Sequence, residues 1–476
     1  MIHAPTCKIS QTWLDIVSDA QSFARRIRVR RTRLRGLGHT SHCLTRFCGI
    51  YRRPTRCSAS ALVRPIRDYT SVSDALSAVM AKARVERRVE TVPTGQAFGR
   101  VSASDLLAPA DVPPFPTSHM DGFAVISRDL ETATQAHPAR LVVAGESRPG
   151  APPKHKIRPG EAVQVATGAP LPTGADAVVP KESAEVRGHE ILVRVALGPQ
   201  SYVYARGEDV RKGEAVISKG HTFRAQDVGL VVALGFTKLK VWRKPRVSVI
   251  ATGSELTAAS RPLEGKVRES HSPIFLRLLE GSGCIPVDMG IVGDDPRALA
   301  MILRKALRTS DFVLTLGGTS AGKRDFVVEV ASSLKPDVII HGIKLDRGRV
   351  TGIARVKGKP VLMLPGPIQA AMNAFLVMGT PIIQALSGNT KVGFELPCRM
   401  GADWECRRKF PNFQKVVYVR LDWDNEVTAG PLSAETESLR LLADADGYVL
   451  VPEGVTRINK GSAVRVRLFP GFSYVL

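Results

Sequence analysis

Between residues 245 and 386, short apolar runs alternate with longer amphipathic stretches, and this alternation constrains the fold more than any other feature. The apolar runs predict strands at 246–251, 285–292, 312–316, 338–341 and 361–364. The stretches between them predict helices near 272–283, 296–309, 325–334 and 368–386. Strands that alternate with helices in this way form parallel sheets with helices on both faces. We therefore predict a central α/β domain over residues 244–388.

Three glycine-containing loops each follow one of these predicted strands. They are Thr252-Gly253-Ser254-Glu255, Gly317-Gly318-Thr319-Ser320-Ala321-Gly322 and Pro365-Gly366. Because ligands of parallel sheets bind outside the carboxyl ends of the strands, we expect these loops to share one edge. Glycines let the backbone approach a ligand closely, and free N–H groups near a helix N-terminus suit a phosphate. The loops predict a site for a phosphorylated anion, with plain turns as the alternative.

Charged side chains supply further candidates. Lys344, Arg347 and Arg349 form a compact cationic loop after the predicted strand at 338–341. Such a loop can hold a phosphate or another oxyanion, although a solvated turn has the same composition. Acidic candidates for Mg²⁺ are Asp121, Glu208, Asp294 and Asp295, each of which could instead be a solvated surface carboxylate.

Upstream of residue 244 the pattern changes. A helix is expected over 73–89 with Ser73 as its N-cap, and short strands rich in Pro and Gly follow over 92–200. A turn, a short strand and a helix at 225–233 then return, which predicts a first domain split by an inserted β domain. The predicted domains are 66–105 with 200–243 (split N-terminal domain), 106–199 (inserted β domain), 244–388 (α/β) and 389–476 (C-terminal β-barrel).

Residues 1–65 form a basic arm. The whole chain has 67 Lys and Arg against 44 Asp and Glu, a net charge of +23, and the arm alone carries +11. We interpret the arm as disordered or not part of the natural protein, with Val63 as an alternative start. A targeting segment and a nucleic-acid contact are the other interpretations. Cys43 and Cys48 give only a loose zinc spacing.

Cysteine count and hydropathy indicate where the chain works. Seven cysteines without paired spacing argue against a disulfide framework and favour reduced thiols. We find neither a secretory signal peptide nor an apolar run of about 18–20 residues, the length of a membrane span. We therefore expect a cytoplasmic location and no membrane partner.

Taken in order, the loops resemble the MoeA-type molybdopterin molybdenumtransferase family, whose relatives include the E domain of gephyrin. The matching segments are Ser118-His119-Met120-Asp121-Gly122-Phe123-Ala124-Val125, Val165-Ala166-Thr167-Gly168-Ala169-Pro170-Leu171-Pro172, Arg206-Gly207-Glu208-Asp209-Val210, Ala251-Thr252-Gly253-Ser254-Glu255-Leu256, Gly290-Ile291-Val292-Gly293-Asp294-Asp295, the loop at 317–322 with Asp325, and Leu364-Pro365-Gly366. The likeness covers roughly residues 66–470, and the motifs occur in the family's order.

The resemblance implies the four predicted domains and a homodimer with its active site in a cleft between subunits. It also implies a reaction in which molybdate, or tungstate, is inserted into adenylylated molybdopterin with release of AMP. A divalent metal, Mg²⁺, would assist this molybdenum cofactor biosynthesis. A molybdopterin adenylyltransferase would be a partner, and nucleic acid would not.

The resemblance also suggests roles for individual residues. Those expected to be catalytic are Asp121, Thr167, Glu208 and Ser254, and the expected metal ligands are Glu208, Asp294 and Asp325. The expected substrate-binding residues are Thr252, Gly253, Gly317, Gly318, Thr319, Ser320, Lys344, Arg349, Pro365 and Gly366, with Lys344 and Arg349 attracting the oxyanion.

The chain departs from the family pattern at one sheet edge. Ser254 stands where the family usually has an acid, Asp346 replaces a basic residue, and Pro367 replaces an asparagine. The element before the helix at 272 is Glu269-Ser270-His271, where the family has an Asp-x-Asn pattern. These changes leave open a catalytically weak paralogue that binds molybdopterin, oxyanion or nucleotide without turnover. A pyrophosphohydrolase sharing only the α/β domain is a further alternative.

Overall fold

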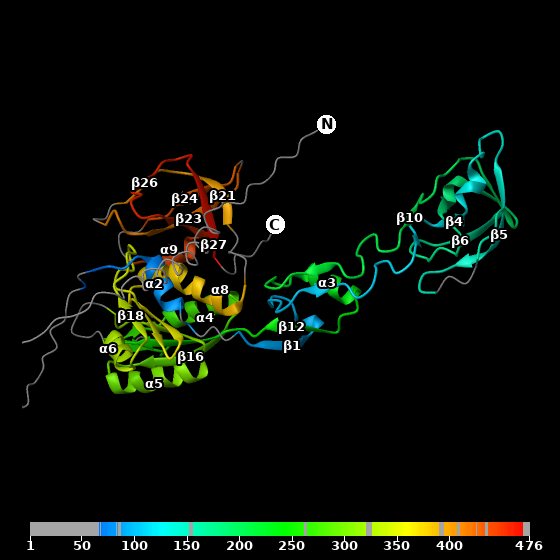
Figure 1. The fold of residues 1–476 in the computed structure, drawn as a ribbon. Helices are drawn as coiled ribbons and strands as arrows, with labels where there is room; N and C mark the ends of the chain where they lie inside the picture. Colours follow the sequence, from blue (N-terminus) through cyan, green and yellow to red (C-terminus); the bar gives the residue numbers. More distant parts are fainter. Residues whose placement is uncertain are drawn as a thin grey trace, which may run out of the picture. The chain divides into compact units, whose positions relative to one another are not determined.

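A computed structural model describes most of the chain after the basic arm (Figure 1). The described residues are 66, 68–81, 83, 87–151, 156–260, 264–319, 326–389, 395–406, 410–424, 426–433 and 437–469. The predictions for the arm, for Val63 and for a Cys43–Cys48 zinc site lie outside these residues. So do the candidate site residues Ser320 and Asp325.

The α/β domain is built on a six-stranded sheet in the order β16-β13-β17-β20-β19-β18. The strands are β13 (Arg246–Thr252), β16 (Ile285–Val292), β17 (Phe312–Leu316), β18 (Val338–His341), β19 (Gly352–Val356) and β20 (Lys359–Leu364). The first four in spatial order are parallel, as predicted, and β19 runs antiparallel to both of its neighbours. Our prediction missed β19, which returns through a two-residue turn at Lys357 and Gly358.

Helices cover both faces of this sheet, as predicted (Figure 1). One face packs on α5 (Pro296–Thr309) and α6 (Phe326–Ser333). The other packs on α2 (Val72–Met80), α4 (His271–Gly281), α7 (Ile368–Ala374), the π-helical segment η4 (Phe375–Gly379) and α8 (Thr380–Ser387). Along β13, Val247 and Val249 belong to one apolar cluster and Ile250 to the other, because successive strand side chains alternate between faces.

The first helix begins earlier and is shorter than predicted. Its N-cap is Ser71, whose Oγ accepts a hydrogen bond from the Asp74 backbone N–H at 3.1 Å, so the assignment of Ser73 was wrong. Ser71 is the N-cap because a helix that begins directly after it places Val72, Ala75 and Val79 on its buried face. The helix ends at Met80 rather than at 89, and β1 begins at Val89.

Segments on either side of the inserted β domain pair with each other. β1 (Val89–Pro93) pairs with β12 (Lys238–Trp242), and β2 (Leu106–Leu107) pairs with β11 (Ala215–Ile217). The helix α3 (Ala225–Ala233) has the bounds that the sequence predicts. The short 3-10 turn η1 (Thr94–Gln96) lies in this region, while η2 (Ser127–Leu130) and η3 (Lys181–Ser183) lie within the inserted domain.

The inserted segment folds into a six-stranded sheet of its own, in the order β7-β4-β6-β5-β9-β8. Its strands are β4 (Gly122–Val125), β5 (Ala139–Ser147), β6 (Glu161–Val165), β7 (Ala177–Pro180), β8 (Ala184–Arg187) and β9 (Glu190–Val193). Two short strands, β3 (Thr117–Ser118) and β10 (Val203–Tyr204), pair where the chain enters and leaves it.

The C-terminal region closes into a barrel, β21-β24-β23-β25-β27, as predicted. Its strands are β21 (Glu395–Met400), β23 (Lys415–Asp422), β24 (Thr428–Pro431), β25 (Gly447–Val451) and β27 (Ala463–Leu468), with the pair β22 (Trp404–Glu405) and β26 (Arg457–Ile458) and the helix α9 (Leu439–Asp444) beside them. Barrel residues Tyr418 and Tyr448 belong to the same apolar cluster as one face of the α/β sheet. The multidomain fold class is therefore confirmed, while the predicted domain boundaries remain predictions.

One helical run, Ile368–Ser387, is long and apolar enough to cross a membrane by length and composition, which our sequence analysis overlooked. It spans 20 residues, and 72% of its apolar window is buried in the fold. Phe375, Met378 and Ile382 on this run pack into the sheet's apolar cluster. This burial accounts for its composition.

Candidate active site

The glycine loops meet at the carboxyl edge of the sheet, as the sequence predicts. The Gly317 backbone N–H donates to the Leu364 carbonyl at 3.0 Å, which ties the end of β17 to the end of β20. The Thr252 hydroxyl donates to the Leu316 carbonyl at 3.1 Å, and the Gly253 N–H donates to the Val292 carbonyl at 3.0 Å. The ends of four neighbouring strands are therefore joined by hydrogen bonds.

Gly317 is required by this arrangement. Its φ is +92°, in the region that favours glycine, and a Cβ there would lie 2.7 Å from the Thr252 carbonyl oxygen. No side chain fits without moving the end of β13. The glycine thus lets two loops of the edge approach each other.

Thr319 lies in the loop that follows β17 at this edge. It is fully buried, and its Oγ1 has no hydrogen-bond partner among the described residues. His341, the last residue of β18, places its Nε2 3.3 Å from the Thr319 carbonyl oxygen. Our sequence analysis missed His341, although its position at a strand end would have placed it at this edge.

Ser254 ties two of the loops together. Its Oγ accepts a hydrogen bond from the Asp294 backbone N–H at 2.8 Å. The loop then continues into the short strand β14 (Leu256–Thr257), which pairs with β15 (Val267–Arg268). Serine at this position orders the β16 loop through its hydroxyl.

The predicted cationic loop is fastened to the barrel. The Asp346 N–H donates to the Gln414 carbonyl at 2.8 Å, and the Gln414 N–H donates back to the Lys344 carbonyl at 3.0 Å. Lys344 is half-buried, while Arg349 is exposed and its guanidinium lies 5.3 Å from the ring centre of Phe410. The two predicted oxyanion residues therefore stand on a braced loop at the carboxyl end of β18.

A cavity of about 600 Å³ adjoins this loop. Arg347 lines it, hydrogen bonded to Gln369, and Asn373 donates to the Arg347 carbonyl at 3.0 Å. The Tyr418 hydroxyl donates to Asn373 Oδ1 at 2.6 Å, and burial raises the pKa of Tyr418 well above its ordinary value. This network joins residues far apart in the sequence, and no local pattern indicated it.

Asp121 and Thr167 lie in contact in the inserted domain. Asp121 Oδ1 accepts hydrogen bonds from the Thr167 backbone N–H at 2.7 Å and from its hydroxyl at 2.8 Å. These bonds, with help from the charge of Lys181, lower the pKa of Asp121 below its usual value. Asp121 is exposed to solvent and is ionised at neutral pH, and the two bonds from Thr167 further favour its charged form.

Local packing fixes this pair. Gly122 follows Asp121, and a Cβ there would collide with the Val179 carbonyl oxygen of β7. The His119 ring lies 4.5 Å from that of Tyr204, next to the β3–β10 pairing. Glu208 instead accepts a hydrogen bond from the Ala205 N–H at 2.7 Å, within its own turn.

The described residues do not fit a Mg²⁺ site made by protein ligands alone. They contain no group of three or more His, Cys, Asp or Glu side chains that could hold a metal ion. Two other acids bind backbone N–H groups at the starts of helices: Glu269 accepts from the His271 and Ser272 N–H groups of α4 at 2.8 Å, and Glu437 accepts from the Gln369 N–H of α7 at 2.9 Å.

Sequence comparison decides the family. Molybdopterin molybdenumtransferase 2 of Mycobacterium tuberculosis is 31% identical over 385 residues, which cover 79% of this chain and 94% of that protein. The chain belongs to the molybdopterin molybdenumtransferase family. Three family models agree: MoeA N-terminal region (domain I and II) over residues 70–235, a probable molybdopterin binding domain over 248–385, and MoeA C-terminal region (domain IV) over 397–469.

Further relatives cover the same part of the chain. The molybdopterin molybdenumtransferase of Bacillus subtilis is 30% identical over 390 residues, covering 80% of this chain and 89% of the relative. The solved structure of a molybdopterin biosynthesis MoeA protein from Pyrococcus horikoshii matches with a TM-score of 0.74 and 31% identity. That match covers 85% of this chain and all of the solved chain.

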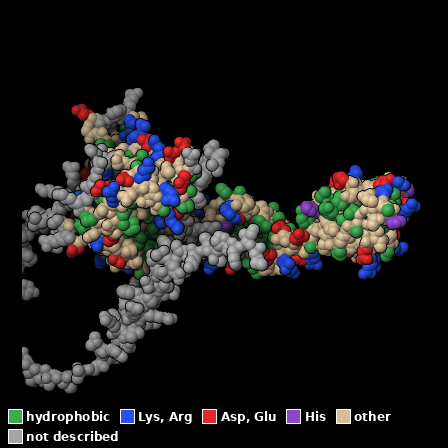
Figure 2. All heavy atoms as spheres, turned by 90° about the horizontal axis from the view of Figure 1, so that it is seen from above, with side chains coloured by type: hydrophobic (Ala, Val, Ile, Leu, Met, Phe, Trp, Pro, Cys, Tyr) green, Lys and Arg blue, Asp and Glu red, His purple; other side chains and the backbone are tan. Residues whose placement is uncertain are grey.

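The charge distribution on the surface can be compared with the nucleic-acid alternative. Figure 2 shows lysine and arginine side chains interspersed with aspartate and glutamate over the visible face of the described residues. A nucleic-acid surface would be expected to gather its cations into a patch or stripe. The described residues on this face carry mixed charge instead, while the nucleic-acid interpretation of the basic arm concerns residues 1–65, which lie outside the described residues.

Proposed function

We propose that this chain inserts molybdate into adenylylated molybdopterin and releases AMP, as a step of molybdenum cofactor biosynthesis. One observation carries the proposal most directly. The segment that matches a probable molybdopterin binding domain, 248–385, forms the sheet whose carboxyl edge joins the loops of Thr252, Gly317 and Leu364. Relatives that bear the transferase name and align over most of their length support the whole-chain activity.

At the sheet edge, backbone N–H groups and the Thr252, Ser254, Thr319 and Ser320 loops would hold the phosphate of the pterin and the nucleotide. Positive φ at Gly253, Gly317 and Gly318 supports this, because such a backbone can approach a ligand closely. Pro365 and Gly366 would close the edge beside β20. This positioning lets the phosphoanhydride bond break while AMP stays oriented.

The charged residues would divide between the two partners of the reaction. Lys344 and Arg349 would attract molybdate, since both lie on the cationic loop after β18. Asp121 is ionised at neutral pH, so it would orient the Thr167 hydroxyl rather than donate a proton. Glu208 and Asp294 would complete the polar lining.

Several finer features of the proposal rest on the family alone. We propose a homodimer with the active site between subunits, a cytoplasmic location, and a molybdopterin adenylyltransferase as the partner that supplies substrate. We also propose a requirement for Mg²⁺ held mainly by substrate phosphates, which is how this ion is commonly bound. Tungstate could replace molybdate, since nothing at Lys344 or Arg349 distinguishes the two oxyanions.

Release of AMP by the purified full chain tests the proposal. We expect AMP to form from adenylylated molybdopterin only when molybdate or tungstate is present. Asp121→Asn should slow release at least about tenfold, because the Thr167 hydroxyl loses its charged acceptor. Asp129→Asn is the matched control, since the Asp129 carboxylate accepts from the Gly160 N–H in the same domain and from no other group among the described residues. Release that ignores the oxyanion would make the chain a hydrolase and refute the proposal.

A second candidate is a protein that binds molybdopterin, oxyanion or nucleotide without turnover. Ser254 favours it, because its hydroxyl is used by the Asp294 N–H and it supplies no charge. Tight binding of adenylylated molybdopterin without AMP release would establish this alternative. In that case Ser254→Asp should create release where the natural chain has none.

A further inference from the structure

A cavity of about 160 Å³ lies at the amino-terminal edge of the α/β sheet, opposite the candidate active site. Pro245 precedes β13, Asp311 precedes β17, and Lys359 is the first residue of β20. The volume is well above the ~10–15 Å³ that one water needs by the same measure. The cavity can therefore hold a group larger than a water molecule.

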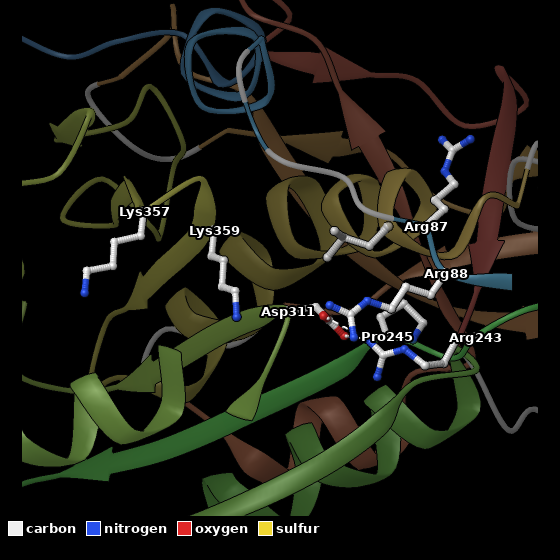
Figure 3. Close-up of a pocket in the computed structure, with 8 residues that line it drawn as sticks. Arg87, Arg88, Arg243, Pro245, Asp311, Lys357 and Lys359 are labelled. Carbon is white, nitrogen blue, oxygen red and sulfur yellow. Dashed lines mark hydrogen bonds and ion pairs between the residues drawn. The ribbon is translucent and has the colours of Figure 1, made fainter. Parts of the chain in front are cut away.

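The lining is strongly cationic. Five of its side chains are basic and one is acidic: Arg87, Arg88, Arg243, Lys357, Lys359 and Asp311. Figure 3 shows Lys357 and Lys359 extending on one side, while Arg88 and Arg243 lie with Asp311 on the other. Both sides of the cavity thus present positive charge.

The single carboxylate is already occupied. Both oxygens of Asp311 accept from Arg243 Nη2, at 3.0 and 2.9 Å, and Oδ2 also accepts from the Arg246 N–H at 2.8 Å. The Nε of Arg243 is buried and has no hydrogen-bond partner among the described residues. Asp311 therefore offsets the charge of Arg243, while the Nε–H of Arg243 keeps no acceptor among the described residues.

Neutral groups fix other cations in place without cancelling their charge. Lys359 Nζ donates to the carbonyls of Leu307 and Ser310, at 2.7 and 2.8 Å, where α5 ends. Arg87 donates from Nε and Nη2 to the Ala385 carbonyl near the end of α8. The neighbouring carboxylate of Asp337 is taken by Arg355 rather than by the cavity.

Lys357 is the cation that the fold explains least. It sits in the turn between β19 and β20 with a φ of +53°, a conformation that favours glycine or asparagine over lysine. Its side chain is exposed and makes no hydrogen bond or ion pair with the described residues. The charge of Lys357 therefore does not stabilise the turn, and asparagine would suit this backbone conformation at least as well.

We propose that this cavity binds a diphosphate group, either inorganic diphosphate or the diphosphate of a nucleotide, between its lysine wall and its arginine wall. Two cationic walls match two linked phosphates, and guanidinium forks suit phosphate oxygens. Because the cavity lies at the opposite edge from the glycine loops, the ligand binds without occupying the candidate active site.

Titration calorimetry of the full chain in about 0.15 M NaCl, which screens weak surface binding, tests the proposal. Diphosphate should bind saturably, and Lys357→Asn should weaken it about tenfold or more, the loss expected for one charged contact. Lys335→Asn is the matched control, because Lys335 is an exposed lysine with a φ of +54° outside the cavity. Arg243→Lys, which keeps a charge beside Asp311, should also weaken binding.

The folding of the variants is checked by the free energy of unfolding. Lys357→Asn should be at least as stable as the natural chain, because asparagine tolerates the positive φ. ADP that binds through the same Lys357-sensitive site identifies a nucleotide as the source, and diphosphate alone identifies the inorganic ion. The proposal is overturned if diphosphate binds no more tightly than phosphate, or if Lys357→Asn binds like Lys335→Asn.

Discussion

At the residue scale, hydrogen bonding sets the pKa and the role of the acidic side chains. The pKa of Asp121 is lowered because Thr167 donates to it twice. Asp227 on α3 is buried, and the pKa of its carboxyl is lowered chiefly by the Arg224 guanidinium, with His221 Nε2 2.6 Å from Oδ2. The first carboxylate is exposed and lies in a loop of the inserted domain, whereas the second holds a helix N-terminus in place.

Asp227→Asn should destabilise the fold by about 1–3 kcal/mol, because the Arg224 guanidinium loses its charged acceptor. The pKa of Asp227 is lowered in the folded state, so its carboxylate stabilises the fold at pH values above its unfolded pKa, ordinarily 3.8. This stabilisation is lost as the pH falls from that value through the lower folded-state pKa. Urea unfolding between pH 3 and 7 should show the natural chain losing more stability on acidification than the variant. Equal slopes would contradict the account.

Cys284 should be unreactive in the folded chain. Burial raises the pKa of its thiol to about 12, so almost no thiolate forms near neutral pH. Iodoacetamide labelling followed by mass spectrometry should modify Cys284 only after denaturation. Labelling of the native chain at the rate of the denatured chain would show that the thiol is accessible.

At the element scale, the loops at strand ends depend on backbone geometry that only glycine provides. Gly317→Ala should cost about 1–3 kcal/mol, because its Cβ would press on the Thr252 carbonyl and φ is positive. Gly229→Ala is the matched control in α3, where a Cβ meets nothing within 4 Å, and it should stabilise by about 0.5–1 kcal/mol. Equal effects of the two substitutions on urea unfolding would refute this explanation.

Local signals explain which elements the sequence predicted well. The helix α5 has the predicted bounds because Asp295 caps it and Pro296 starts it. The β19 strand was missed because its turn uses Lys357 rather than a residue typical of hairpins. The start of α2 was displaced because Ser71 and Ser73 are both good caps, and only tertiary burial of Val72 chooses between them.

In the candidate site, too, some features could be predicted from the sequence and others could not. Motif spacing placed Thr252, Gly317 and Leu364 at one edge, because parallel strands dictate it. The contacts of Tyr418 with Asn373 could not be predicted, since they join the barrel to the α/β domain across 45 residues of sequence. The hydrogen bond from the Asp294 N–H to the Ser254 hydroxyl could not be predicted either, because residue types alone do not show which loops meet.

At the scale of the whole molecule, the proposed function needs residues from two parts of the chain. Asp121 and Thr167 lie in loops of the inserted domain, before β4 and after β6, whereas Gly317 belongs to the α/β domain. If each active site combines these parts from different subunits, Asp121→Asn and Gly317→Val chains should each be inactive alone. Mixed and reassembled, they should regain about a quarter of natural AMP release, because half of the dimers then carry one intact site. No recovery in verified mixed dimers would place each site within one subunit.

The central claim is that molybdenum transfer and AMP release are one reaction. The most direct measurement is the ratio of molybdenum bound to the pterin dithiolene to AMP released, followed over a single turnover of the full chain with adenylylated molybdopterin and molybdate. The account predicts one molybdenum for each AMP, with both lost together in Asp121→Asn. AMP without molybdenum incorporation, or bound substrate without either product, would contradict it.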